Sequence, residues 1–206
     1  MFSLIFLIIY TLVWTLIVPL LALMALTIVP KWRDGLMMKL GVLPKLSKSG
    51  YIWFHAVSVG ELNALLPLLR QFEGTKILLS TSTVTAQNMA KKKLKAKLEA
   101  QELELIYMPW DHPLIIQAAL NQIKPVAIVL METEIWPALI HLARKQNIPV
   151  AVINARLADA SFAAYKKIKG FFQWIFAHIF IFFTPRSFIL GYRFWVIKCL
   201  YLPTIF

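Results

Sequence analysis

Three glutamates stand where a side chain could take part in catalysis. Glu61 directly follows Gly60, between an apolar run and a segment with helical spacing, and Glu132 and Glu134 close the apolar run 125–131. An ionised carboxylate can act as a general base toward a hydroxyl group. A fixed carboxylate can also stabilise positive charge that develops in a transition state. These glutamates are therefore the first candidates for a catalytic site.

Each carboxylate also has a purely structural interpretation. Glu61 in the first turn of a helix would interact favourably with the helix dipole. Glu134 could cap a helix that begins at Pro137, and Glu132 could pair with Arg156. The sequence leaves both interpretations open.

The remaining polar residues suggest little chemistry. His55 is interpreted as a buried core imidazole, and Asp111 with His112 as a turn. The four histidines show no metal-ligand spacing, and no G-x-G-x-x-G fingerprint occurs. The single cysteine, Cys199, excludes an internal disulfide and a cysteine-based metal cluster. We expect neither a metal nor a cofactor.

The elements that must position these residues follow a regular alternation. Helical segments alternate with apolar, β-branched runs, which predicts right-handed βαβ crossovers and a parallel sheet. The fold class is therefore α/β, a Rossmann-like domain. The predicted strands are 51–57, 76–82, 105–108, 125–131 and 149–154, and the predicted helices are 62–72, 85–98, 114–123 and 137–146.

Ligands of such a sheet gather beyond the carboxyl ends of its strands. Five loops meet at that edge, and three of them carry carboxylates. The loops are 58–61, 81–85, 109–113, 132–134 and 154–156.

Residues 1–30 contain no charged side chain. This uncharged run is longer than the roughly 20 residues that a transmembrane helix needs. They lack the basic start and short apolar core of a cleaved signal, and the alternative is a buried core helix. The following segment 31–50 is rich in lysine and arginine, so the positive-inside rule places the rest of the chain in the cytoplasm. We expect a single-pass protein with its domain on the cytoplasmic side.

The net charge of +12 does not indicate a nucleic-acid partner. Part of it flanks the apolar segment, and part forms the lysine run 91–97, which resembles the solvated face of a helix. No aromatic residues interleave with these lysines, as a nucleic-acid footprint would require. Anionic lipid head groups are the better partner, because juxtamembrane basic residues are attracted to them.

Four motifs together resemble the Kdo transferases, membrane-anchored enzymes that add 3-deoxy-D-manno-octulosonic acid to the lipid A precursor. Their order and spacing match the family, behind a single N-terminal anchor that also matches. The motifs are Trp53–Glu61, Tyr107–Pro113, Met131–Pro137 and Asn154–Leu157, the last followed by Ser161 and Tyr165.

The resemblance implies the N-terminal, acceptor-binding domain of a two-domain GT-B glycosyltransferase in the cell inner membrane. The implied reaction is inverting, metal-independent transfer from CMP-Kdo to a lipid A precursor. Glu61 would be the proton acceptor and Glu132 the transition-state stabiliser. The expected substrate-binding residues are Ser58, Gly60, Thr83 and Arg156.

Two departures from the family pattern bear on activity. The loop 83–86 has valine and alanine where the family usually has proline and glycine. From residue 179 onward the resemblance stops, which predicts a domain over 51–180, an aberrant hydrophobic tail over 181–206 and no donor domain. A frameshifted or prematurely ended product is expected, the alternative being a second membrane segment over 171–183. Such a chain could be a catalytically silent fragment that only binds the lipid acceptor.

Overall fold

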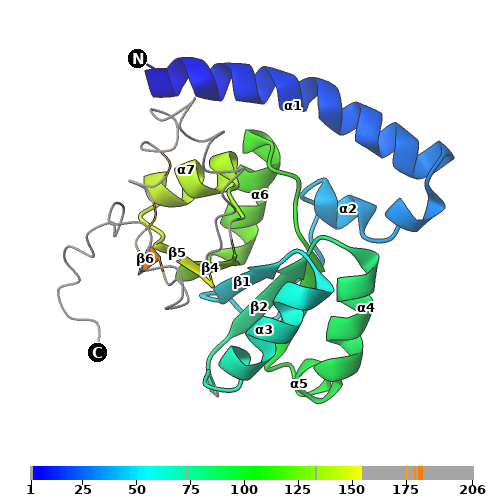
Figure 1. The fold of residues 1–206 in the computed structure, drawn as a ribbon, viewed down its shortest axis with the longest axis vertical. Helices are drawn as coiled ribbons and strands as arrows, with labels where there is room; N and C mark the ends of the chain where they lie inside the picture. The colour runs from blue at the N-terminus through cyan, green and yellow to red at the C-terminus, as the bar shows by residue number, and fades with distance from the viewer. Residues whose placement is uncertain are drawn as a thin grey trace, which may run out of the picture.

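The computed structural model describes residues 2–72, 74–132 and 134–154, together with 175, 179, 181 and 182. Within these residues, helices and strands alternate from residue 52 onward, and a long N-terminal helix precedes them (Figure 1). The α/β, Rossmann-like fold predicted from the sequence is confirmed.

The described strands form one parallel sheet. Its order is β3-β2-β1-β4-β5-β6, so the chain first builds outward from β1 and then crosses over to add β4 on the other side. This reversal between β1 and β4 is the kind of point at which open α/β sheets bind ligands. The strands are β1 (Ile52–Ala56), β2 (Ile77–Thr81), β3 (Leu103–Tyr107), β4 (Ala127–Met131), β5 (Val150–Ile153) and β6 (Ile181–Phe182).

Helices cover both faces of the sheet, which explains why its strands are almost wholly apolar. Trp53 of β1 packs in the core that contains Leu120, under α6 (Pro113–Ile123) and α7 (Pro137–Lys145). The next residue, Phe54, belongs to the opposite core under α3 (Val59–Leu69) and α4 (Val84–Lys93). Figure 1 shows the two pairs of helices on either side of the strands.

The predicted helix 85–98 is in fact two helices. Leu94 leaves the helical conformation, with φ −109° and ψ 17°, and separates α4 from α5 (Lys95–Glu99). The lysine run on both sides of the break places like charges one turn apart, which destabilises a continuous helix. The helix predicted at 62–72 is α3, and it starts earlier, at Val59, because Ser58 caps it.

The N-terminal helix α1 (Phe2–Thr27) runs along the outside of the domain (Figure 1). Its segment Ile5–Thr27 is long and apolar enough to cross a membrane, with a mean hydropathy of 2.5. Large side chains along it are exposed, including Leu16 at 77%. The alternative of a buried core helix is therefore wrong. The chain continues through η1 (Pro30–Trp32) and α2 (Leu36–Lys39) into β1.

Candidate functional site

The site lies at the carboxyl ends of β1, β2 and β4, where the sheet order reverses. Ser58 is the N-cap of α3, and its Oγ accepts a hydrogen bond from the Glu61 N–H at 3.3 Å. In return, the Ser58 hydroxyl donates to Glu61 Oε1 at 3.1 Å, and the Val57 N–H donates to Oε2 at 2.8 Å. This reciprocal arrangement is a capping box, which fixes the position of the Glu61 carboxylate.

Glu61 is buried, with 6% of its surface exposed. Burial raises the pKa of its carboxyl group above the ordinary value, and the charge of Glu132 raises it further. The hydrogen bonds from Val57 and Ser58 act in the opposite direction. The result is a carboxylate that is held rigidly and is more basic than a solvated glutamate.

Glu132 directly follows β4 in a strained conformation. Its φ is +56°, in the left-handed region, which costs a residue with a side chain of the order of 1–3 kcal/mol. Its N–H donates to the Ile153 carbonyl at 2.8 Å, so the sheet pairing continues through the kinked residue. Backbone strain of this kind clusters at functional sites.

Glu134 completes a group of three interacting carboxylates. Burial first, and then the charges of Glu61 and Glu132, raise its pKa to about 7. The structure thus brings together three glutamates from two loops. A side chain with a pKa near neutrality is suited to proton transfer, and no sequence motif indicated this property of Glu134.

The capping role considered for Glu134 belongs to another residue. Asp111 is fully buried, and its two carboxylate oxygens accept from the N–H groups of Ala138 and Leu139 at 3.0 and 2.9 Å, in the first turn of α7. Asp111 also accepts a hydrogen bond from the Tyr10 hydroxyl of α1 at 2.5 Å. Burial raises the pKa of Asp111 to about 7.

The interpretation of Asp111 and His112 as a mere turn is therefore wrong. His112 caps α6 by accepting a hydrogen bond from the Leu114 N–H at 3.2 Å. One sequence signal could have indicated the role of Asp111. Pro137 begins α7, but Trp136 before it offers the helix no side-chain cap. Such a helix end needs an acceptor from elsewhere in the fold.

Of the four predicted substrate-binding residues, Ser58 is the cap of α3 described above, and the other three differ in their positions. Thr83 is the N-cap of α4, and its hydroxyl lies 3.4 Å from the Val57 carbonyl, so it adjoins the Glu61 turn. Gly60 lies inside α3, where an added Cβ would meet only Ser58 Oγ at 3.7 Å, so no tight turn requires a glycine. Arg156, and with it the pairing to Glu132, lies outside the described residues.

His55 is fully buried, as the sequence suggested. Its Nδ1 lies 2.9 Å from Ser80 Oγ, and its ring meets Trp136 edge-on. Burial lowers its pKa to about 4, so the imidazole is neutral at physiological pH. Among the described residues, no group of three or more histidine, cysteine, aspartate or glutamate side chains could hold a metal ion.

A hollow of about 460 Å³ lies beside Thr83, and Glu61, Glu132 and Glu134 are not among the residues that line it. Residues from α1, η1, α2, the β2–α4 connection, the start of α4 and the loop after β3 line it. They are Leu21, Lys31, Trp32, Lys39, Ser82, Thr83, Val84, Thr85 and Trp110.

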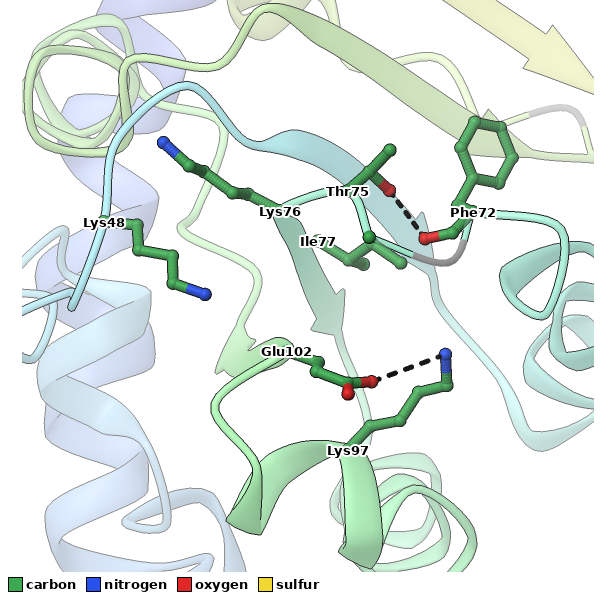
Figure 2. A pocket seen from close by; sticks show the side chains of 8 residues that line it. Lys48, Phe72, Thr75, Lys76, Ile77, Lys97 and Glu102 are labelled. Atoms are coloured by element: carbon green, nitrogen blue, oxygen red, sulfur yellow. Dashed lines mark hydrogen bonds and ion pairs between the residues drawn. The ribbon is translucent and has the colours of Figure 1, made fainter.

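A smaller hollow, of about 160 Å³, lies at the opposite, amino end of β2 (Figure 2). Lys48 donates to the Gln101 carbonyl and Lys76 to that of Ser49, while Lys97 pairs with Glu102. The lysines of this hollow are engaged with the protein itself, and the hollow lies at the other end of the strands from Glu61, Glu132 and Glu134. We do not count it as part of the candidate site.

Comparison with known proteins points to one family. A family model described as 3-deoxy-D-manno-octulosonic-acid transferase (kdotransferase) matches residues 34–187, well over half of the chain. The chain is 39% identical over 127 residues to a bifunctional glycosyltransferase/methyltransferase of Fusobacterium nucleatum. It is 37% identical over 128 residues to the 3-deoxy-D-manno-octulosonic acid transferase of Haemophilus influenzae, and 33% over 112 residues to that of Bordetella pertussis.

These alignments cover 60%, 62% and 53% of the chain, but only 19%, 30% and 26% of the three relatives. The chain therefore spans less than a third of the length of the curated relatives it matches.

Proposed function

Because the chain belongs to the 3-deoxy-D-manno-octulosonic acid (Kdo) transferase family and corresponds to its N-terminal domain, we propose that it forms the acceptor-binding part of a Kdo transferase. The reaction is transfer of Kdo from CMP-Kdo to a hydroxyl group of a lipid A precursor, with inversion and without a metal. The observation that carries the proposal is the group of Glu61, Glu132 and Glu134 at the point where the sheet order reverses.

In this proposal Glu61 is the general base. It removes the proton from the acceptor hydroxyl as the oxygen attacks the anomeric carbon of Kdo and CMP departs with the bonding electrons. A base must be ionised and close to the proton that it accepts. The capping box holds the carboxylate in place, and its raised pKa increases its affinity for the proton.

Glu132 stabilises the positive charge that develops on the Kdo ring as the bond to CMP breaks, as carboxylates do in glycoside hydrolysis. Its strained backbone supports this role, because such a conformation persists only where the surrounding structure holds the residue in place. Glu134 holds a proton for part of the time at neutral pH. This partial protonation reduces the electrostatic repulsion between the three groups.

The apolar helix α1 anchors the chain in the cell inner membrane, with the domain on the cytoplasmic side. The length and hydropathy of Ile5–Thr27 support an anchor, and the basic residues after it support the orientation. This location would place the site beside the lipid acceptor.

A second candidate is a catalytically silent chain that only binds the acceptor. One observation favours it: both carboxylate oxygens of Glu61 already accept hydrogen bonds from the protein.

A chimera separates the two candidates. Residues 34–154 replace the matching segment of the Haemophilus influenzae transferase, and transfer from CMP-Kdo to lipid A precursor is measured. We expect kcat/KM within about tenfold of the parent enzyme, which corresponds to a loss of at most about 1.4 kcal/mol of transition-state stabilisation. A chimera that is folded by thermal melting and binds the acceptor, but transfers nothing, would support the silent binder instead.

A further inference from the structure

We propose that His55 is a positioning residue of the candidate site. Through the ring of Trp136 it holds the loop of Glu132 and Glu134 in place against the turn of Glu61, an arrangement called here the His55 brace. The brace itself stands on the geometry of the described residues. Its importance for Kdo transfer rests on the proposed function, in which these glutamates take part in catalysis.

His55 lies at the junction of the two loops that carry the glutamates. It is near the carboxyl end of β1, and in the sheet register it is opposite Ser80 of β2 and Leu130 of β4. Two residues further on, the Val57 N–H donates to the Glu61 carboxylate at 2.8 Å. The backbone of β1 therefore connects His55 to Glu61, at the point where the sheet order reverses.

The imidazole contacts the second loop through Trp136. The two rings meet edge-on, with 5.4 Å between the ring centres and 82° between the ring planes. Trp136 directly precedes α7 and lies two residues after Glu134, so it belongs to the connection that carries Glu132 and Glu134. Because edge-to-face ring pairs have a preferred geometry, the position of the His55 ring constrains that of Trp136.

The sheet fixes the His55 ring from behind. Nδ1 lies 2.9 Å from Ser80 Oγ and 3.2 Å from the Ser80 carbonyl oxygen, so either tautomer of the neutral ring finds a partner there. Ser80 Oγ in turn accepts a hydrogen bond from the Trp53 indole N–H at 2.8 Å. All three side chains are fully buried. The imidazole therefore cannot turn away from Trp136 without losing a hydrogen bond in the core.

The other ring nitrogen of His55 indicates a role beyond core packing. Nε2 is buried and has no hydrogen-bond partner among the residues that the structure describes. A buried polar atom without a partner is unfavourable, and an apolar side chain would fill the same place without it. Departures of this kind from simple packing call for an explanation and are typical of functional sites. The position of His55 between the two loops provides one.

The ring is neutral, which suits a positioning role beside carboxylates. Burial lowers the pKa of His55 to about 4, so the imidazole carries no charge at physiological pH. A cation at this position would lower the pKa of Glu134. Instead, burial and the charges of Glu61 and Glu132 raise that pKa to about 7, and the Trp136 indole acts weakly in the opposite direction.

NMR titration of the Glu134 carboxyl, in the full 206-residue chain in detergent, tests the brace. The glutamates carry a carbon isotope label at the side-chain carboxyl, and the Glu134 signal is the one missing from Glu134→Gln. His55→Leu removes the ring, so the loop should loosen and Glu134 should become better solvated and more distant from Glu61. We expect the acid dissociation constant of Glu134 to rise about tenfold or more, which lowers its pKa.

A second variant and a control make the result specific. His55→Gln also lacks the ring but can still form a hydrogen bond to Ser80, and it should give the same rise, so it decides the result if His55→Leu does not fold. Tyr51→Phe is the matched control. It removes a buried hydroxyl that donates to Glu104 at 2.6 Å, directly before β1 and at its far end, and should change the dissociation constant less than about twofold.

A folded His55→Leu or His55→Gln protein in which Glu134 titrates as in the unaltered chain, or at higher pH, would overturn the brace. The titration uses neither CMP-Kdo nor an acceptor, so such a result leaves the proposed function standing. Conversely, the dissociation constant could rise as expected while His55→Leu in the chimera retains the full kcat/KM. The brace would then stand, and the catalytic role of the glutamates would fail.

Discussion

Glu61 combines a structural and a chemical property that do not exclude each other. Its carboxylate closes the capping box of α3, and burial raises its pKa. A carboxylate has about four lone-pair positions, and the two hydrogen bonds leave positions that can receive a substrate proton. The two interpretations that the sequence left open therefore describe one residue.

Glu134 should make stability depend on pH. Its pKa is raised to about 7 in the folded state, so its stabilising contribution is present below about pH 4 and is lost as the pH rises through 7. Glu134→Gln should therefore raise the unfolding free energy at pH 8 by about 1 kcal/mol, after allowance for its partial exposure. At pH 5 the substitution should have only about a quarter of this effect, because the folded-state carboxyl is still protonated.

Thermal melting of both proteins at pH 5 and pH 8 measures this difference. Ser58→Ala is a useful control, because it should lower stability at both pH values by removing a helix cap. An equal effect of Glu134→Gln at the two pH values would show that the Glu134 carboxyl is not perturbed.

The positions of these glutamates could be predicted, because a carboxylate after an apolar strand stands out in the sequence. The pKa of Glu134 could not. It depends on burial and on two other carboxylates, one of which lies on a different loop, and neither quantity is contained in a local pattern.

At the scale of elements, one buried residue connects three helices. Asp111 caps α7, accepts a hydrogen bond from Tyr10 of α1, and precedes the cap of α6 at His112. The N-terminal end of α7 follows directly after the loop that carries Glu132 and Glu134. Asp111 thereby helps to hold the loop of the catalytic candidates in place.

Asp111→Ala should lower the unfolding free energy by about 2–4 kcal/mol, because it leaves the two N–H groups of α7 buried without an acceptor. Asp111→Asn retains one acceptor oxygen and should cost clearly less. Urea unfolding in detergent gives both values. If the alanine and asparagine variants were equally stable, the capping role of Asp111 would be disproved.

The strands could be predicted to within about two residues from β-branched and apolar runs, and the structure has a strand at each of the five predicted places. The break at Leu94 was missed because the apolar spacing continues across it. Likewise, a cap that acts across 27 positions cannot be seen in a local motif.

For the whole molecule, the main question is whether α1 crosses the membrane or stays packed along the domain. In the structure Tyr10 of α1 reaches Asp111, whereas a helix that crosses a bilayer would move Tyr10 into hydrocarbon. A hydrogen bond contributes about 1 kcal/mol, while burying one large apolar side chain contributes about 1.5–3 kcal/mol. Many such side chains on α1 are exposed, and it carries no charged face for lying in the membrane plane. We therefore expect insertion to prevail.

Labelling with a membrane-impermeant maleimide tests this topology. In a Cys199→Ser background, a cysteine at Lys45 should be unreactive in spheroplasts and should react after permeabilisation, because positive charge keeps this segment in the cytoplasm. A cysteine at Ser3 should react from outside in both cases. Labelling at position 45 in intact spheroplasts would contradict the proposed orientation.

The parallel, Rossmann-like sheet was predicted from the sequence, whereas the order of its strands is known only from the structure. The position of α1 against the domain, and the hollow beside it, could not be predicted from the sequence. Both arise from contacts between segments that are far apart in the chain, such as the hydrogen bond from Tyr10 to Asp111.

The most direct test compares Glu61→Gln with the unaltered chimera described above. The amide oxygen can still accept the hydrogen bond from the Val57 N–H, and the Ser58 hydroxyl can rotate to accept one from the amide NH2 group. The melting temperature should therefore change little, and acceptor binding should be retained. Loss of a general base should lower kcat/KM by about 10²–10⁴-fold. A Glu61→Gln chimera that retains full kcat/KM but melts at a lower temperature would show that Glu61 is only a helix cap, and would contradict the assignment of the base.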